Sequence, residues 1–225
     1  MNVDRRGRWL ALGTALVGFA CGGGGGGGTG PCTPGAATQL VKTSGDPAPW
    51  YFNNPLPAAL SVTARDANNC PVPGVAVTWA PGSGGGGVTS PSTTNASGVA
   101  TATDSIGSSS PQMVTATFAG LATPVTFTVT ATAPPTSAAV TVNNNFFSPN
   151  AVVMQSGGTV TWTWSAGAVN HNVTYTSGPT PRPANTTTTS VNAPATFSST
   201  ISAVGTYGYA CTNHPGMSGT VTVVH

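Results

Sequence analysis

Apolar and polar side chains alternate with a period of two residues along most of the chain from Ala36 onward. The alternation is clearest at 60–65, 75–79 and 125–130, where an apolar residue occupies every second position. This period places one side of a strand in a core and the other in solvent. Clusters of Asn, Pro and Gly separate the segments, for example at 68–74. Short strands separated in this way predict an all-β protein with antiparallel sandwich architecture.

A segment with two adjacent prolines, ATAPPTS at 131–137, interrupts the pattern and favours an extended backbone. Further alternating segments follow at 139–142, 151–154, 159–164 and 220–224. We therefore expect two β-sandwich domains in tandem, residues 36–132 and 138–225, joined by a proline linker at 133–137.

Charged residues make up only 4% of the 225 residues, with four acidic and six basic side chains. An ordinary soluble domain has about 25%. Long solvated helices and coiled coils need far more charge, nucleic-acid binding needs a basic face, and acid–base catalysis needs carboxylates or imidazoles. From Cys21 onward, three basic and three acidic side chains balance. The composition therefore favours an extracytoplasmic protein that is not an enzyme and does not bind nucleic acid.

Residues 1–21 have the pattern of a targeting segment. Three Arg residues precede a mostly apolar run at 9–20, which is shorter than the about 20 residues that span a bilayer and fits a signal peptide. The small residue before Cys21 resembles a bacterial lipoprotein cleavage site, which implies a lipid anchor on Cys21. Gly22 follows in place of Asp, and the same resemblance then implies the outer membrane, facing the periplasm or the cell surface. The alternative is ordinary cleavage nearby, which would release a soluble protein. Residues 22–35 follow as a flexible, glycine-rich tether.

The remaining cysteines are Cys32, Cys70 and Cys211. Cys32 lies just before the first expected strand of the first domain, and Cys70 lies just after the second. If these strands are antiparallel neighbours, the start of one lies beside the end of the other, and a bridge between Cys32 and Cys70 can form. Two free thiols are the alternative. The pairing would leave Cys211 unpaired, which calls for an explanation in an oxidising compartment.

The first domain resembles bacterial Ig-like domains of the invasin/intimin type. The resemblance rests on DANNCPVPGVAVTW at 66–79, TNASGVATAT at 94–103 and VTATFAG at 114–120. It implies a rigid structural spacer, and adhesion is the alternative that the family also offers. The domain contains no His, and nothing in it points to chemistry.

The candidate chemistry lies near the C-terminus, in the pattern Cys-x2-His-x2-Met formed by Cys211, His214 and Met217. A turn at Pro215-Gly216 can bring His214 and Met217 back toward Cys211, and His171 comes from a second loop. One thiolate, two imidazoles and a thioether are the ligands of a trigonal His₂Cys copper site with a weak axial Met. Zinc rarely recruits Met, and a Cys–His nucleophile would have no acid in this domain to orient it.

Residues 138–225 resemble a small cupredoxin of the plastocyanin/amicyanin kind. The short spacing of Cys211, His214 and Met217 is similar to that of amicyanin, and His171 matches the isolated first His ligand of the family. The resemblance implies a Greek-key sandwich and one copper ion. It also implies that Asn172 bonds across to the loop bearing the cysteine, with Thr212 as its partner. A polar insertion at 177–191 departs from the family pattern, and the sequence indicates no purpose for it.

These features together predict a monomeric type 1 copper protein that passes single electrons outside the cytoplasm, carried on an Ig-like stalk. Its partner would be a redox protein, either a cytochrome or an oxidase. Two other hypotheses remain at this point: a copper scavenging or delivery protein without a redox partner, and a surface adhesin or structural protein whose cupredoxin fold is incidental.

Overall fold

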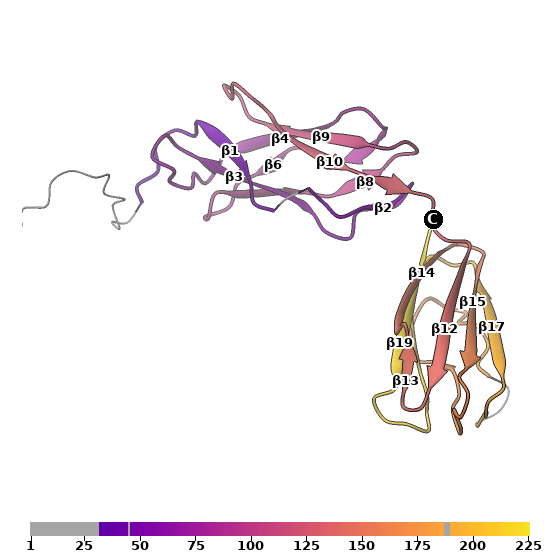
Figure 1. Cartoon of the computed structure of the whole chain (residues 1–225). Helices are drawn as coiled ribbons and strands as arrows, with labels where there is room; N and C mark the ends of the chain where they lie inside the picture. The colour runs from indigo at the N-terminus through magenta and orange to yellow at the C-terminus, as the bar shows by residue number, and fades with distance from the viewer. Residues whose placement is uncertain (1–31, 45, 187–189) are drawn as a thin grey trace, which may run out of the picture. The chain divides into compact units, whose positions relative to one another are not determined.

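The computed structural model describes residues 32–44, 46–186 and 190–225. Within these ranges all regular structure is β-strand, β1 to β19, as the alternation predicted, and Figure 1 labels many of these strands. No helix in the described ranges is long and apolar enough to cross a membrane. The expected signal peptide, the lipidation site at Cys21 and most of the glycine-rich tether lie outside the described residues.

The first domain contains two main antiparallel sheets and two short strand pairs. One sheet has the order β1-β3-β7, with β1 at Gln39–Lys42, β3 at Leu60–Arg65 and β7 at Val99–Ala102. The other has the order β10-β9-β4-β6, with β4 at Ala76–Pro81, β6 at Ser92–Thr93, β9 at Gln112–Thr117 and β10 at Val125–Val129. The short pairs join β2 (Trp50–Tyr51) to β11 (Ala131–Thr132) and β5 (Gly86–Val88) to β8 (Asp104–Ile106).

The core of this domain is built from the inward positions of the alternating strands. Val62 on β3, Val77 and Trp79 on β4, and Phe127 on β10 are all buried in one cluster. The Trp79 indole donates a hydrogen bond to Ser92 Oγ at 2.8 Å, so its polar atom is paired inside an apolar environment. Burying one such large side chain contributes about 1.5–3 kcal/mol, and the alternation therefore determines which face of each sheet turns inward.

The structure contains the expected bridge between Cys32 and Cys70, with their Cα atoms 5.6 Å apart. Strands β1 and β3 are antiparallel neighbours, with Gln39 opposite Arg65, so the start of one lies beside the end of the other. In the chain-entropy model, a loop of this length contributes roughly 3–4 kcal/mol to stability. Cys211 is the free cysteine among the described residues, and it is buried.

The second domain consists of two four-stranded sheets. The first has the order β13-β12-β15-β17, with β12 at Ser137–Asn143, β13 at Phe146–Ser148, β15 at Gly158–Trp164 and β17 at Thr196–Ile201. The second has the order β14-β19-β18-β16, with β14 at Ala151–Gln155, β16 at Thr174–Tyr175, β18 at Gly205–Ala210 and β19 at Ser218–Val224. Strand β12 begins at Ser137, the last residue of the expected linker.

Aromatic rings fill the space between these sheets. Trp162 is fully buried and meets Tyr175 and Tyr209 edge to face, at centroid separations of 6.1 and 5.2 Å. Such pairs contribute about 0.5–1.5 kcal/mol each beyond area burial. Tyr207, Tyr209 and Cys211 share the inward face of β18 and its continuation, and all three are buried. The packing therefore fixes the end of β18, from which the candidate ligand loop begins.

Candidate metal centre

The ligand loop connects β18 to β19 across residues 211–217. Its ends are tied together, because the Cys211 N–H donates to the Met217 carbonyl at 3.0 Å. Inside the loop, the Met217 N–H donates to the His214 carbonyl at 3.2 Å, which closes a tight turn. Gly216 lies in that turn with φ at +84°, a conformation that glycine adopts without steric cost. The expected turn at Pro215-Gly216 therefore returns the chain toward Cys211.

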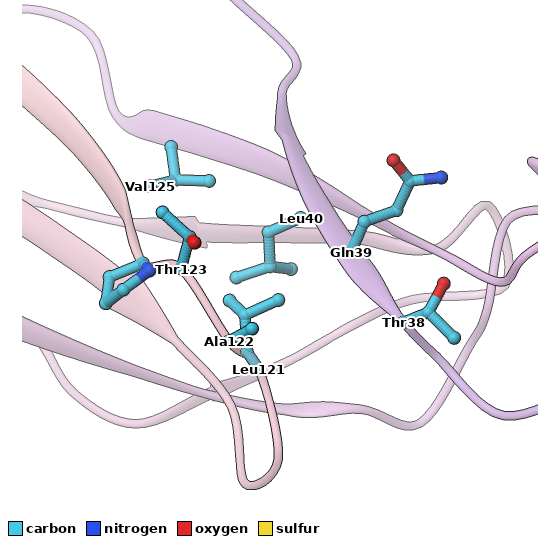
Figure 2. Close-up of a pocket in the computed structure, with 8 residues that line it drawn as sticks. Thr38, Gln39, Leu40, Leu121, Ala122, Thr123 and Val125 are labelled. Carbon is cyan, nitrogen blue, oxygen red and sulfur yellow. The ribbon is translucent and has the colours of Figure 1, made fainter.

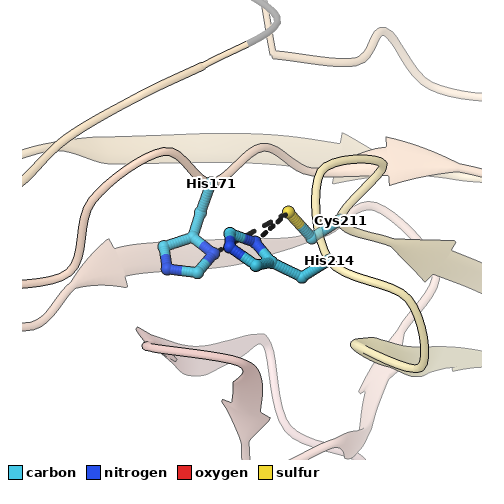
Figure 3. A group of neighbouring side chains, drawn as sticks. All are labelled: His171, Cys211 and His214. Atoms are coloured by element: carbon cyan, nitrogen blue, oxygen red, sulfur yellow. Dashed lines mark hydrogen bonds between the residues drawn. The ribbon is translucent and has the colours of Figure 1, made fainter.

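Three candidate ligands converge on one point, as Figure 3 shows. The Cys211 sulfur lies 3.4 Å from His214 Nδ1 and 3.7 Å from His171 Nδ1. One ligand atom from each residue lies within 4.8 Å of the others. The two imidazole rings are 4.4 Å apart between centroids. His171 comes from the segment before β16 and the other two residues come from the ligand loop, so the site joins two loops as expected.

The fourth expected ligand, Met217, is buried in the same core cluster as Cys211, with 1% of its surface exposed. The short turn at His214 carries Met217 back to the start of the loop, since its carbonyl accepts the Cys211 N–H. The Met217 side chain is therefore shielded from solvent at the buried end of the ligand loop. His214, in contrast, is half-buried and forms the side of the site nearest solvent.

Burial and then the charge of His214 lower the pKa of His171 below its ordinary value. A neutral imidazole is the form that ligates a metal, so this environment favours the binding-competent state. Residues 138–225 contain no Asp or Glu, and therefore no carboxylate of this domain competes for the imidazoles or for a metal. The donor set is one thiol, two imidazoles and a nearby buried thioether, which is the set that suits copper in both oxidation states.

Asn172 and Thr212 join the two ligand-bearing loops. The Asn172 amide donates to Thr212 Oγ1 at 2.7 Å, and its oxygen accepts the Thr212 N–H at 2.9 Å. Asn172 follows His171 and Thr212 follows Cys211, so each partner is the direct neighbour of a candidate ligand. These are the contacts that the resemblance implied for the pair.

Sequence reasoning did not identify Asn170, which joins three segments. Its N–H donates to Asn192 Oδ1 at 2.7 Å, and its carbonyl accepts a hydrogen bond from the Asn213 amide at 2.9 Å. Ser190 Oγ donates to its side-chain oxygen. Asn170 has φ at +63°, in the left-handed region that Asn tolerates better than most residues. In the sequence, the only indication of a role for Asn170 was its place directly before His171.

The polar insertion at 177–191 returns alongside the His171 segment. His171 and Val191 exchange two backbone hydrogen bonds, at 3.0 and 2.8 Å, and the Thr186 N–H donates to the Val173 carbonyl at 3.1 Å. The end of the insertion thus acts as a strand-like partner for the backbone that carries His171. The sequence indicated no purpose for this insertion. In the structure, it supports the backbone of a candidate ligand.

The first domain offers no comparable chemistry among its described residues. A hollow of about 380 Å³ lies between β1 and the loop before β10. Figure 2 shows the side chains that line it. The hollow is lined by Thr38, Gln39, Leu40 and residues 121–125, and none of these side chains is ionisable. The metal-ligating group of the described chain is therefore confined to the second domain.

The fold and the site define a protein with two β-sandwich domains, the second of which gathers a His–Cys–His group from two buried residues and the half-buried His214. Residues 53–132 match the family of bacterial Ig-like domains (group 1), and residues 136–224 match the copper binding proteins of the plastocyanin/azurin family. The chain thus carries a bacterial Ig-like domain followed by a plastocyanin/azurin-type copper-binding domain. This confirms the predicted fold class, the order of the two domains and copper as the cofactor.

Several solved cupredoxin structures are similar to part of the chain. A purple cupredoxin from Nitrosopumilus maritimus is 28% identical over 39% of this chain and 99% of its own, with a TM-score of 0.34. A reduced amicyanin variant is 28% identical over 39% and 82%, with a TM-score of 0.34. Plastocyanin from Dryopteris crassirhizoma is 25% identical over 39% and 100%, with a TM-score of 0.33. No curated protein sequence matches the chain.

Proposed function

We propose that the second domain holds a type 1 copper ion and carries single electrons. Cys211, His171 and His214 would supply the three strong ligands, and Met217 the weak axial one. The observation that supports this assignment most directly is the approach of two imidazole Nδ1 atoms to one buried thiol, at 3.4 and 3.7 Å. Copper bound there would supply a one-electron couple, because the sulfur donors suit Cu(I) and the imidazoles also suit Cu(II).

In this function the protein holds the copper ligands in a fixed arrangement. Paired backbone and side-chain hydrogen bonds fix the ligand loop and the His171 segment, through Asn172, Asn170 and Val191. A site whose ligands are already gathered needs little rearrangement when its charge changes by one electron. The half-buried His214 is the natural exit for that electron, because it is the ligand that reaches furthest toward solvent.

The role in the cell that we propose follows from the sequence. Lipidation at Cys21 would anchor the chain in the cell envelope, at the outer membrane, facing the periplasm or the cell surface. The Ig-like domain would serve as a spacer, and the chain would act as a monomer and an electron carrier, with a cytochrome or an oxidase as its redox partner. The absence of acidic residues from 138–225 supports a non-enzymatic role, because acid–base catalysis by carboxylates has no residue to use there.

The test is copper binding by the chain without its leader, residues 22–225. We expect one equivalent of Cu(II) to produce an intense blue colour by charge transfer from the Cys211 thiolate, and reversible one-electron reduction at an electrode. Cys211→Ser should abolish the colour. The double variant Cys32→Ser and Cys70→Ser is the matched control, because it removes two sulfurs from the first domain and should stay blue.

Two results would contradict the proposal. A colourless wild-type copper complex would exclude the type 1 assignment. A blue complex that cannot be reduced and reoxidised at the electrode would favour copper scavenging or delivery over electron transfer. Adhesion to cells or matrix by the copper-free chain would instead support the adhesin hypothesis for the first domain.

A further inference from the structure

The outer nitrogen of the His171 ring has its own partner, Asn144. The Asn144 side-chain oxygen lies 3.2 Å from His171 Nε2, while the opposite ring nitrogen, Nδ1, faces the Cys211 sulfur at 3.7 Å. Asn144 is 27 residues away in sequence and belongs to neither ligand loop. The ring is therefore held between a side chain on one edge and the candidate metal position on the other.

The orientation of the Asn144 amide is fixed by two backbone groups of the loop before His171. Its Nδ2 donates to the Gly167 carbonyl at 3.3 Å, and its Oδ1 accepts the Val169 N–H at 3.4 Å. A flipped amide would place N–H against N–H and oxygen against oxygen, losing both contacts. The backbone therefore requires that Oδ1, an acceptor only, faces His171.

An acceptor at this position determines which nitrogen of His171 carries the proton. In a neutral imidazole one nitrogen is a donor and the other an acceptor, and a partner on one side selects the tautomer. With Oδ1 beside Nε2, the ring donates from Nε2 and keeps its lone pair on Nδ1. We propose that Asn144 is a positioning residue that selects the Nε2–H tautomer of His171 and so presents Nδ1 to copper, an inference that rests on the proposed copper site.

The topology explains why a residue so distant in sequence reaches the site. Strands β12 and β15 are parallel, with Val142 opposite Trp164, so both end at the same edge of the sheet. The chain leaving β15 toward His171 therefore passes the turn that follows β12. Asn144 and Asn145 form that turn, between the paired residues Asn143 and Phe146, and Asn145 has φ at +71°.

The first test needs no metal. In the copper-free chain, residues 22–225, long-range proton–nitrogen NMR of the His171 ring above its pKa should show the Nε2–H tautomer alone. Asn144→Leu, close to Asn in shape but without an acceptor, should give a mixture containing the Nδ1–H form. Asn144→Asp keeps the acceptor oxygen and should restore the wild-type pattern. Asn143→Ala is the matched control, since the Asn143 amide contacts the Thr141 carbonyl instead, and it should leave the tautomer unchanged.

The second test is copper affinity. Loss of the hydrogen-bond partner of a metal ligand typically weakens metal binding about 10–100-fold. Asn144→Leu should therefore bind Cu(II) about 10–100-fold more weakly than the wild-type chain. Asn143→Ala should bind it with wild-type affinity. The proposal is overturned if wild-type His171 carries its proton on Nδ1, if Asn144→Leu keeps only the Nε2–H form, or if its tautomer shifts with unchanged copper affinity. Failure of the wild-type chain to bind copper would instead contradict the proposed function, because the tautomer measurement does not use copper.

Discussion

Asn172 and Thr212 are linked by two hydrogen bonds that run in opposite directions, at 2.7 and 2.9 Å. One bond joins their side chains, and the other connects the Asn172 oxygen to the backbone N–H next to Cys211. Only 2% of the surface of Asn172 is exposed, so water has little access to its side chain. The pair therefore couples the backbone position of the thiol to the backbone position of His171.

Removal of this link should loosen the site and destabilise the second domain. In Asn172→Ala both hydrogen bonds are lost and a buried polar side chain is deleted, which should lower the free energy of unfolding by about 1–3 kcal/mol. Copper should still bind, but with a broader visible spectrum. Denaturant unfolding of the copper-free chain measures the first effect, and a copper titration measures the second.

The matched comparison for that prediction is Thr212→Val, which removes the hydroxyl but keeps the backbone N–H. It should lower the free energy of unfolding about half as much as Asn172→Ala does, by on the order of 1 kcal/mol. Equal destabilisation of the two variants would mean that the bond to the backbone N–H contributes nothing. If neither variant is destabilised, the proposed coupling of the two loops is wrong.

The residues close to the metal position could be predicted from a local pattern and from the cupredoxin resemblance. Cys211, His214 and Met217 occupy one short loop, whereas the link between Asn172 and Thr212 was implied only by the resemblance. The alternation of apolar residues also predicted the inward faces of the strands, since a period of two has one physical meaning in a sheet. The Cys32–Cys70 bridge followed from a single assumption, that β1 and β3 are antiparallel neighbours, which the register bears out.

Asn144 and Asn170, which act on the His171 segment from tertiary contacts, could not be predicted. Asn144 reaches His171 only because β12 and β15 are parallel and end together, and no spacing in the sequence reports that pairing. Asn170 joins three segments whose proximity depends on how the insertion folds back. These contacts depend on tertiary structure, whereas sequence patterns report local structure and burial.

An axial role for Met217 makes a prediction about potential. Met217→Gln replaces a soft thioether with an amide oxygen, which favours Cu(II), so the site should keep copper while its reduction potential falls. Met113→Gln is the matched control. It makes the same change on the exposed surface of the first domain and should leave the potential unchanged. Voltammetry of the copper-loaded chain measures both.

His214→Ala should behave differently from Met217→Gln. It deletes a strong ligand on the side of the site nearest solvent, so added imidazole should enter and restore the blue colour. Loss of copper to the same degree in Met217→Gln and His214→Ala would contradict the distinction between a weak axial ligand and a strong one.

The hydrogen bonds of Asp66 predict that the stability of the first domain falls at acid pH. Its Oδ2 accepts the Gly35 N–H at 2.8 Å, and its Oδ1 accepts the N–H groups of Cys70 and Asn68 at 2.9 and 2.8 Å. These bonds, led by that from Gly35, lower the pKa of Asp66 from its ordinary value of 3.8. A lowered folded-state pKa contributes stability that is present above the ordinary pKa and is lost as the pH falls through the lowered one.

We therefore expect amide hydrogen exchange in β1 and β3 to accelerate as the pH drops below about 4, beyond the intrinsic change in exchange rate. In Asp66→Asn one carboxylate oxygen is replaced by an NH₂ group, which cannot accept a hydrogen bond, so the Gly35 and Cys70 bonds cannot both be kept. The amides of β1 and β3 should therefore exchange faster at neutral pH, and their exchange should depend less on acid. Asp46→Asn provides the comparison: Asp46 pairs with Lys42 and accepts the Thr128 N–H at 3.0 Å. Both contacts are exposed, and exposed pairs contribute little to stability. An equal acid response in the two variants would refute the role of Asp66.

Thiol counting tests the disulfide. When the chain of residues 22–225 is denatured without reductant and alkylated, the label should appear on Cys211 and on neither Cys32 nor Cys70, because those sulfurs are joined. Cys32→Ser should release a second thiol and add label at Cys70. Mass spectrometry of the labelled peptides locates the sites, and label on Cys70 in the wild-type chain would show that the bridge does not form in solution.

Lipidation at Cys21 would attach the protein to the membrane without affecting its copper site. Each buried CH₂ of an acyl chain contributes about 0.8 kcal/mol to membrane binding, so a chain acylated at Cys21 should sediment with membranes and be released only by detergent. Cys21→Ser should appear in the soluble fraction yet bind copper with wild-type stoichiometry, because none of the candidate ligands lies in residues 1–35. Cys32→Ser is the control, since it removes a cysteine outside the proposed cleavage site and should stay with the membrane. If the Cys21→Ser protein also remains in the membrane fraction, the anchor is not the lipid at this position.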